Sequence, residues 1–170
     1  LGAGGFLGRY ICREGKTRGY RIIGVGRTPP LEEAEYDIFV QGDLLKLDLL
    51  PLLQAENPFC VINAAGASSV AASFENPLLD FRQTVEGQAC VLEALRQSGN
   101  SAFYIYLSSA AVYGEPETLP VREDMPCRPI SPYGFHKRQA ELLQEEYVRF
   151  FGLQGAVLRI FSAYGDDLER

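Results

Sequence analysis

Two side chains that can exchange a proton stand four residues apart in the segment Tyr133–Lys137, which reads Tyr-Gly-Phe-His-Lys. The segment opens a stretch with helical periodicity, so Tyr133 and Lys137 are expected on one face of a helix, one turn apart. A free phenol has a pKa of about 10, too high for an efficient base near neutral pH. A neighbouring ammonium favours the phenolate. The pair predicts proton transfer by Tyr133, although such a pair without context is usually an ordinary surface pair.

A glycine-rich turn lies near the other end of the chain, where residues 2–8 read Gly-Ala-Gly-Gly-Phe-Leu-Gly directly before a helical stretch. Glycines allow backbone to approach a pyrophosphate closely. The helix that follows offers free N–H groups and a partial positive charge to phosphate oxygens. The spacing differs from the Gly-x-Gly-x-x-Gly fingerprint, because Leu7 takes the place of its last glycine. The turn predicts a dinucleotide site at Gly2, Gly5, Phe6, Leu7 and Gly8, with a ligand-free turn as the alternative.

The strand predicted next along the chain bears on the choice of dinucleotide. NAD-specific sites usually place an acidic residue at the end of this strand, roughly 20 residues beyond the glycines. Here the strand runs into Gly24-Val25-Gly26-Arg27-Thr28, which contains no acid. A guanidinium at Arg27 can instead pair with a 2′-phosphate. The sequence therefore favours NADP over NAD, unless Arg27 is a solvated loop residue.

Apolar segments alternate with helical periodicity along the chain, which is typical of a parallel sheet covered by helices. The predicted strands are 21–25, 38–40, 60–64, 103–107 and 156–160. The predicted helices are 6–18, 44–55, 77–97 and 132–151. Between them, 113–131 carries four prolines and is predicted to be a long irregular loop of the kind that tends to be functional. We expect an α/β protein with a Rossmann-type doubly wound parallel sheet in three layers.

Composition narrows the possible functions. The 170 residues suit one domain with a buried core, and a net charge of −6 argues against binding nucleic acid, which needs clustered Lys and Arg. No apolar run approaches the roughly 20 residues of a membrane span. The four cysteines form no Cys-x-x-Cys pair and the chain has one histidine, so we expect no metal site. A reduced, cytoplasmic setting fits best.

Further motifs follow in order along nearly the whole chain. They are Gly42-Asp43-Leu44, Asn63-Ala64-Ala65-Gly66, Ser109-Ala110-Ala111-Val112-Tyr113-Gly114, Ser131-Pro132-Tyr133-Gly134 and Leu158-Arg159-Ile160-Phe161-Ser162-Ala163-Tyr164-Gly165. With the glycine turn and the Tyr-Lys pair, they resemble the short-chain dehydrogenase/reductase superfamily, specifically its extended branch of NAD(P)-dependent epimerases, dehydratases and reductases acting on nucleotide sugars. The resemblance implies an NAD(P)-dependent oxidoreductase or epimerase that acts on a sugar nucleotide, with Tyr133 as the acid and base.

The resemblance also implies roles for individual residues. Ser109 would hydrogen-bond the reacting oxygen, and Lys137 would bind the nicotinamide ribose as well as assist Tyr133. Asp43 and Leu44 would lie beside the adenine. The strand end at Ala64, Ala65 and Gly66 would contact the cofactor. By the same resemblance, helices 77–97 and 132–151 would form a homodimer interface.

Departures from the family pattern are informative. Members that eliminate water carry an acidic pair after the catalytic hydroxyl residue, but this chain has Ala110 and Ala111 there, which disfavours 4,6-dehydration. Thr84 and Ser162 stand where the family often has Asn, so the particular substrate stays open. His136 takes a position often held by Ser, and we interpret it as structural.

Two expectations concern the whole chain. We expect residues 1–170 to be a single NAD(P)-binding domain from a longer protein, without the strand that precedes the glycine turn and without the substrate-binding part, and therefore unstable when expressed alone. Two other functions stay open. The first is a non-catalytic NADP-binding regulator or redox sensor on this fold, against which the intact Ser-Tyr-Lys set argues. The second is an interaction module.

Overall fold

The computed structural model describes residues 1–29 and 35–165, which alternate strands with helices. The strands are β1 (Ile23–Gly26), β2 (Ile38–Gln41), β3 (Cys60–Asn63), β4 (Phe103–Ser109) and β5 (Gln154–Ile160). Every strand pairing in the described residues is parallel, in the orders β1-β2 and β3-β4-β5. The expected α/β fold with a parallel, Rossmann-type sheet is therefore confirmed.

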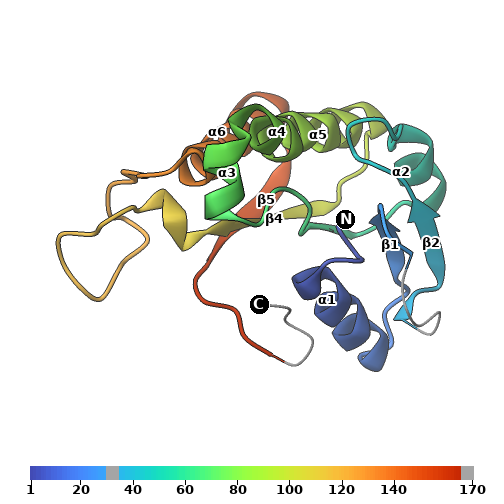
Figure 1. Ribbon diagram of the computed structural model, residues 1–170. Coiled ribbons are helices and arrows are strands. Elements are labelled where there is room, and N and C mark those ends of the chain that lie inside the picture. The colour runs from blue at the N-terminus through green and yellow to red at the C-terminus, as the bar shows by residue number, and fades with distance from the viewer. Residues whose placement is uncertain (30–34, 166–170) are drawn as a thin grey trace.

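Helices lie on both faces of the strands (Figure 1). The helices are α1 (Phe6–Thr17), α2 (Leu50–Glu56), α3 (Val70–Glu75), α4 (Pro77–Phe81), α5 (Gly87–Ser98) and α6 (Pro132–Phe151). Helices α3 to α6 gather on one face, and α1 lies on the other. None of the described helices is long and apolar enough to cross a membrane.

The helix expected over 44–55 begins later, at Leu50. Residues 43–47 form a turn instead. The carboxylate of Asp43 accepts from the N–H of Leu45, and its backbone carbonyl accepts from the N–H of Leu47. Asp48 then accepts from the N–H of Leu50 at 3.0 Å, and Pro51 follows in the first turn, where its missing N–H costs nothing. Local hydrogen bonding from the two aspartates overrides the apolar periodicity of this segment.

The helix expected over 77–97 is interrupted. Between α4 and α5 the chain forms one π-helical turn, η2 (Arg82–Glu86), a feature found mostly at functional sites. The short helix α3 was missed by the sequence analysis. It begins after Ser69, whose hydroxyl accepts from the N–H of Ala72 at 3.2 Å.

Residues 1–3 run between the two sets of strands. The backbone nitrogen of Leu1 donates to the carbonyl of Ile62 in β3, and the N–H of Ala3 donates to the carbonyl of Val25 in β1 at 3.0 Å. An apolar cavity of about 640 Å³ lies beside them, lined by residues of α1, β1, α2 and β3. These two hydrogen bonds connect β1 and β3 through the backbone of residues 1–3.

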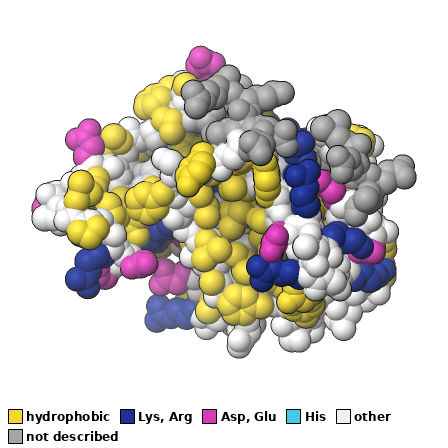
Figure 2. All heavy atoms as spheres, turned by 90° about the horizontal axis from the view of Figure 1, so that it is seen from below, with side chains coloured by type: hydrophobic (Ala, Val, Ile, Leu, Met, Phe, Trp, Pro, Cys, Tyr) yellow, Lys and Arg dark blue, Asp and Glu magenta, His cyan; other side chains and the backbone are white. Residues whose placement is uncertain are grey.

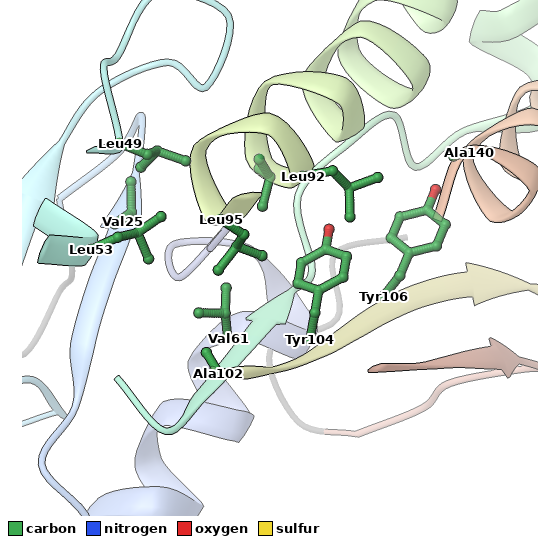
Figure 3. Close-up of a cluster of buried hydrophobic side chains, with 11 residues drawn as sticks. Val25, Leu49, Leu53, Val61, Leu92, Leu95, Ala102, Tyr104, Tyr106 and Ala140 are labelled. Carbon is green, nitrogen blue, oxygen red and sulfur yellow. The ribbon is translucent and has the colours of Figure 1, made fainter. Parts of the chain in front are cut away.

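The hydrophobic core fills the space between the strands and α5 (Figure 3). Val91 and Leu92 of α5 have no exposed surface, and Tyr104 of β4 is almost as deeply buried. Burying large apolar side chains of this kind is the main stabilising contribution to such a layered fold. The core therefore fixes α5 and β4 as the rigid frame on which the loops at the strand ends are built.

The opposite face of β4 and β5 is apolar and open. Seen from below, hydrophobic side chains gather in a band across the molecule (Figure 2). Side chains alternate between the two faces of a strand. Tyr104 and Tyr106 are buried, whereas Phe103 and Leu158 remain exposed.

Candidate active site

A cavity of about 220 Å³ lies where the glycine turn meets the carboxyl ends of β1 and β3. In open α/β sheets, ligands bind at this edge. Most of the cofactor residues expected from the sequence line this cavity, namely Gly2, Gly5, Arg27, Asp43, Leu44, Ala64, Ala65 and Gly66. The fold therefore brings together residues that are scattered over the first 66 positions of the chain.

The glycine turn fits a pyrophosphate because its backbone is too crowded for side chains. Gly2 has a φ of 74°, and a Cβ at Gly8 would stand 2.1 Å from the carbonyl oxygen of Gly2. Helix α1 begins directly after Gly5, so the N–H groups of Phe6, Leu7 and Gly8 form its first turn. First-turn N–H groups have no partner inside a helix and can bind phosphate oxygens.

Arg27 and Thr28 follow β1 and line the cavity beside Asp43. The carbonyl of Arg27 accepts from the side chain of Gln41 at 3.0 Å, which holds the backbone at the strand end. Among the described residues, the only acidic one that lines the cavity is Asp43, whose carboxylate already accepts from the N–H of Leu45. Within the described residues, no ion pair occupies the guanidinium of Arg27.

A buried amide positions the backbone that lines the other side of the cavity. Asn63, at the end of β3, is 2 % exposed and donates to the hydroxyl of Tyr104 at 2.9 Å and to the side-chain oxygen of Gln88 at 3.1 Å. Its own side-chain oxygen accepts from the N–H of Ala65 at 3.0 Å. A buried polar network that is fully satisfied rigidifies its surroundings. Asn63 therefore fixes the Ala64–Gly66 segment.

The π turn and the first residue of α5 border the cavity, a position that the sequence did not predict for them. Gln83 and Gly87 line the cavity, and the buried hydroxyl of Thr84 accepts from the N–H of Ala67 at 3.4 Å. Helical periodicity across 77–97 does not reveal this interruption, since a π turn keeps the helical composition. Thr28 and Leu45 were also missed, although each directly follows a residue that was expected to bind the cofactor.

Two serines fix the start of α6, and with it Tyr133. Ser131 caps the helix by accepting from the N–H of Gly134 at 3.1 Å. Ser73 of α3 accepts from the N–H of Tyr133 itself at 3.1 Å. Because both caps are supplied by buried side chains, the first turn of α6 has little freedom to move.

The Ser109 side chain lies at the end of β4, where it accepts from the N–H of Ala111 at 3.2 Å and shares a hydrogen bond with Tyr133. Burial raises the pKa of Tyr133 above its ordinary value, and the nearby Asp80 carboxylate adds to the rise, whereas the Ser109 hydrogen bond lowers it. The expectation that the protein itself acidifies this phenol is therefore wrong. Burial, which disfavours the charged phenolate, is the largest effect on this pKa.

Lys137 lies one helical turn beyond Tyr133, as expected, and its side chain lies between Tyr133 and the cavity. Its Nζ atom donates to the carbonyl of Leu107 at 3.1 Å and lies 5.7 Å from the centre of the Tyr133 ring. A Cβ added at Gly66 would stand 3.7 Å from the same Nζ atom. Burial lowers the pKa of Lys137 to about 8, against the opposing effects of Asp80 and Glu141.

An ion-pair network centred on Glu141 lies one helical turn beyond Lys137. Glu141 of α6 is buried and accepts two hydrogen bonds from Arg159 of β5, at 3.0 and 2.9 Å. Ser108 donates to the same carboxylate at 2.6 Å. Burial alone would raise the pKa of Glu141, but these hydrogen bonds hold it below its ordinary value. The network ties β4, β5 and α6 together just beyond Lys137.

The arrangement can support one kind of chemistry well. Ser109, Tyr133 and Lys137 lie together at the end of β4, and Lys137 also lies close to Gly66, which lines the cavity. A hydroxyl, a phenol and an amine placed side by side can bind a substrate oxygen and move its proton. In the described part of the chain, no group of three His, Cys, Asp or Glu side chains is placed to hold a metal ion.

The chain resembles known proteins over almost its full length. The model of the NAD dependent epimerase/dehydratase family matches residues 1–169. A putative UDP-glucose 4-epimerase of Methanocaldococcus jannaschii is 32% identical over 97% of this chain and 55% of the relative. The chain spans about half the length of the curated relatives it matches.

Solved structures agree with this resemblance. UDP-glucose 4-epimerase of Brucella ovis, in complex with NAD, superposes with a TM-score of 0.91 at 32% identity, covering 98% of this chain and 52% of that structure. UDP-glucuronic acid 4-epimerase of Bacillus cereus, in complex with UDP-glucuronic acid and NAD, gives a TM-score of 0.85 at 27% identity, covering 96% and 56%.

Proposed function

The chain belongs to the NAD dependent epimerase/dehydratase family, and on this basis we propose that residues 1–170 form the cofactor-binding domain of an NAD(P)-dependent enzyme that epimerises a nucleotide sugar. The convergence of Ser109, Tyr133 and Lys137 beside the cavity at the glycine turn carries the proposal. Relatives named as UDP-sugar 4-epimerases support the substrate class.

The proposed reaction interchanges the two configurations of a sugar carbon that bears a hydroxyl. When bound, the nicotinamide cofactor supplies reversible acceptance of a hydride from that carbon. Ser109 holds the hydroxyl oxygen, and Tyr133 takes the hydroxyl proton as the carbon is oxidised to a ketone. Tyr133 returns the proton when hydride comes back to the opposite face. Lys137 stabilises the phenolate form of Tyr133 while the proton is held there.

The residues after Ser109 support epimerisation over dehydration. Ala110 and Ala111 form the short 3-10 turn η3 (Ala110–Val112) at the end of β4. Neither alanine can serve as an acid or a base, so removal of water from a neighbouring sugar carbon lacks the groups that it needs.

The cofactor residues divide along the cavity. The first turn of α1 would hold the pyrophosphate, Asp43 and Leu44 would lie beside the adenine, and the Ala64–Gly66 segment would border the nicotinamide end, near Lys137. Arg27, which lines the cavity without an ion-pair partner among the described residues, favours NADP. The solved relatives described above are NAD complexes, so affinity for both cofactors is the relevant measurement.

A substitution of the proposed base tests the function. The whole protein is incubated with NAD(H) or NADP(H) and a panel of nucleotide sugars, and epimers are separated while absorbance of the reduced cofactor is followed. We expect an epimer to form without net reduction of cofactor, and Tyr133→Phe to lose roughly 10²- to 10⁴-fold in turnover while still binding cofactor.

Tyr20→Phe is the matched control, because Tyr20 is an exposed tyrosine in the loop after α1 and should keep full turnover. Undiminished turnover of Tyr133→Phe would refute the assignment of Tyr133. Net accumulation of reduced cofactor in place of an epimer would identify a dehydrogenase instead.

A second copy of the chain is the proposed partner. Apolar side chains on α4 and α6 are exposed, among them Leu78 at 60 % and Phe135 at 54 %. Phe135 and Leu142 are seven residues apart and so share one face of α6. The whole protein is expected to be a homodimer by light scattering, and Leu142→Glu, which places a charge on this face, should shift it towards monomer. Glu145→Gln, which changes an exposed residue of α6, should leave the dimer intact.

A further inference from the structure

A buried contact between a histidine and an aspartate lies next to the proposed catalytic residues but is not used by the mechanism above. The Nδ1 atom of His136 lies 2.5 Å from Oδ1 of Asp80 in α4. The ring of His136 also contacts Phe81 edge-on, with 5.6 Å between the ring centres. His136 precedes Lys137 directly on α6, so this contact fixes Asp80 against the helix that carries Tyr133 and Lys137.

Asp80 is an unusual residue for its place in the fold. It is 4 % exposed, and no described residue provides a hydrogen bond to its second oxygen, Oδ2. A buried carboxylate with one hydrogen-bond donor is costly, because it has lost its hydration without full compensation. A purely structural contact to His136 would not require a negative charge at this position. The charge therefore calls for a second explanation.

The charge of Asp80 acts on the groups of the active site. Its carboxylate is the largest of the effects that raise the pKa of Lys137 and oppose the lowering by burial. It also contributes to the raised pKa of Tyr133. The titratable groups that Asp80 contacts or whose pKa it affects are His136, Tyr133 and Lys137 on α6 and Tyr106 on β4. Glu141 of α6 acts on Lys137 and Tyr106 as well.

We propose that Asp80 is a positioning residue of the proposed reaction, supplying the buried negative charge that balances the Lys137 ammonium, and that His136 holds this carboxylate in place by donating a hydrogen bond. The inference rests on the proposed function, since it assigns a role in proton transfer. Lys137 needs such a counter-charge, because Leu107 offers it only a neutral carbonyl and no ion pair of the described residues includes it.

The proposal predicts a specific pH dependence. Removing one negative charge beside both groups makes the ammonium easier to deprotonate and the phenol easier to ionise, so both pKa values fall together. The pH–rate profile of an Asp80→Asn enzyme should therefore move to lower pH as a whole. A residue that only supports packing would lower the rate without moving the profile.

The first test needs neither cofactor nor turnover. The whole protein is labelled with ¹³C at lysine Cε, and the Lys137 signal, assigned from its loss in Lys137→Arg, is titrated by NMR. Asp80→Asn is expected to lower the pKa of Lys137 by roughly one unit. Glu75→Gln is the matched control, because it removes one exposed carboxylate from the adjoining helix α3 and should leave this pKa unchanged.

His136 is tested by two substitutions. His136→Asn keeps a donor for Asp80 and should keep both the Lys137 titration and the pH–rate profile. His136→Leu removes the hydrogen bond that holds the Asp80 carboxylate against α6, so both readouts should move in the direction of Asp80→Asn. A profile of His136→Asn displaced to higher pH would instead show that the imidazole acts as a cation, and would overturn its assignment as a neutral hydrogen-bond donor.

The outcomes separate this inference from the proposed function. A wild-type protein that converts no nucleotide sugar, while Asp80→Asn still lowers the pKa of Lys137, would refute the function and leave the electrostatic role of Asp80. A wild-type enzyme that turns over normally, while Asp80→Asn leaves the titration of Lys137 and the pH–rate profile in place, would overturn the inference alone.

Discussion

The hydroxyl oxygen of Ser73 accepts a hydrogen bond from the backbone N–H of Tyr133 at 3.1 Å, although the two residues are 60 positions apart. Ser73 also donates to the carbonyl of Val70 at 2.6 Å and has no exposed surface. Helix α3 therefore caps α6 at the residue that we propose as the base. The position of the phenol depends on tertiary packing as well as on its own helix.

We expect Ser73→Ala to lower the free energy of unfolding by about 1 kcal/mol, the usual cost of a lost helix cap. Turnover should fall more than cofactor affinity, because the cap positions Tyr133 and does not border the cofactor cavity. Chemical denaturation, steady-state kinetics and cofactor titration measure the three quantities.

Ser98→Ala is the matched control for that substitution. Ser98 makes the same pair of hydrogen bonds, donating to the carbonyl of Leu95 at 2.8 Å and accepting from the N–H of Asn100 at 3.2 Å, at the far end of α5. The Ser98→Ala variant should lose about as much stability as Ser73→Ala but keep wild-type turnover. Equal losses of turnover in the two variants would show that Ser73 has no special role.

The glycine turn gives a second prediction. Gly8→Ala places a Cβ against the carbonyl of Gly2, a backbone atom that cannot move without opening the turn. We expect cofactor affinity, measured by calorimetric titration, to fall at least tenfold, which corresponds to about 1.4 kcal/mol. In Gly15→Ala, on the same helix, the new Cβ meets only the end of the Ile22 side chain, which can rotate away. Wild-type affinity in Gly8→Ala would contradict the proposed pyrophosphate site.

The buried ammonium of Lys137 predicts how stability depends on pH. Its pKa is about 8 in the folded protein, below the ordinary value of 10.5, so between these values the unfolded chain binds more protons. The contribution of Lys137 to the free energy of unfolding therefore rises as the pH increases from about 8 to 10.5. Lys137→Met cannot titrate, so its stability relative to wild type should be highest below pH 8 and decline by about 3 kcal/mol towards pH 10.5.

Denaturation at a series of pH values measures this difference, in which other titrating groups cancel. The exposed Lys46 provides the control, since Lys46→Met removes an ammonium that the protein does not bury. A constant difference between Lys137→Met and wild type across the window would show that burial does not penalise this ammonium.

The network behind the site gives a fourth prediction. Glu141→Gln removes the charge that pairs with Arg159, whose guanidinium is itself largely buried. Breaking a buried ion pair at one partner costs about 3 kcal/mol or more, because the remaining charge stays desolvated. Thermal and chemical denaturation should show this loss. Glu145→Gln, exposed one turn further along α6, should change stability by less than about 0.5 kcal/mol.

Local sequence patterns determined most of the strands and helices and the residues that we propose to carry the chemistry. The alternation of apolar and helical segments predicted the parallel strands, because buried strands are continuous apolar runs. Tyr133 and Lys137 could be placed one turn apart, since the helical repeat alone sets that spacing. The glycine-rich turn could also be predicted from the sequence, because the conformational freedom of glycine is a property of the residue itself.

Tertiary structure decided what no local pattern contains. The π turn that brings Gln83 to the cavity, the cap from Ser73 and the pairing of Asp80 with His136 all depend on which elements pack together. The direction of the pKa shift at Tyr133 could not be predicted from the sequence either, because its largest cause is burial, which depends on the whole fold. Residue types along the chain thus determined which groups can react, whereas packing decided the charge environment in which they do so.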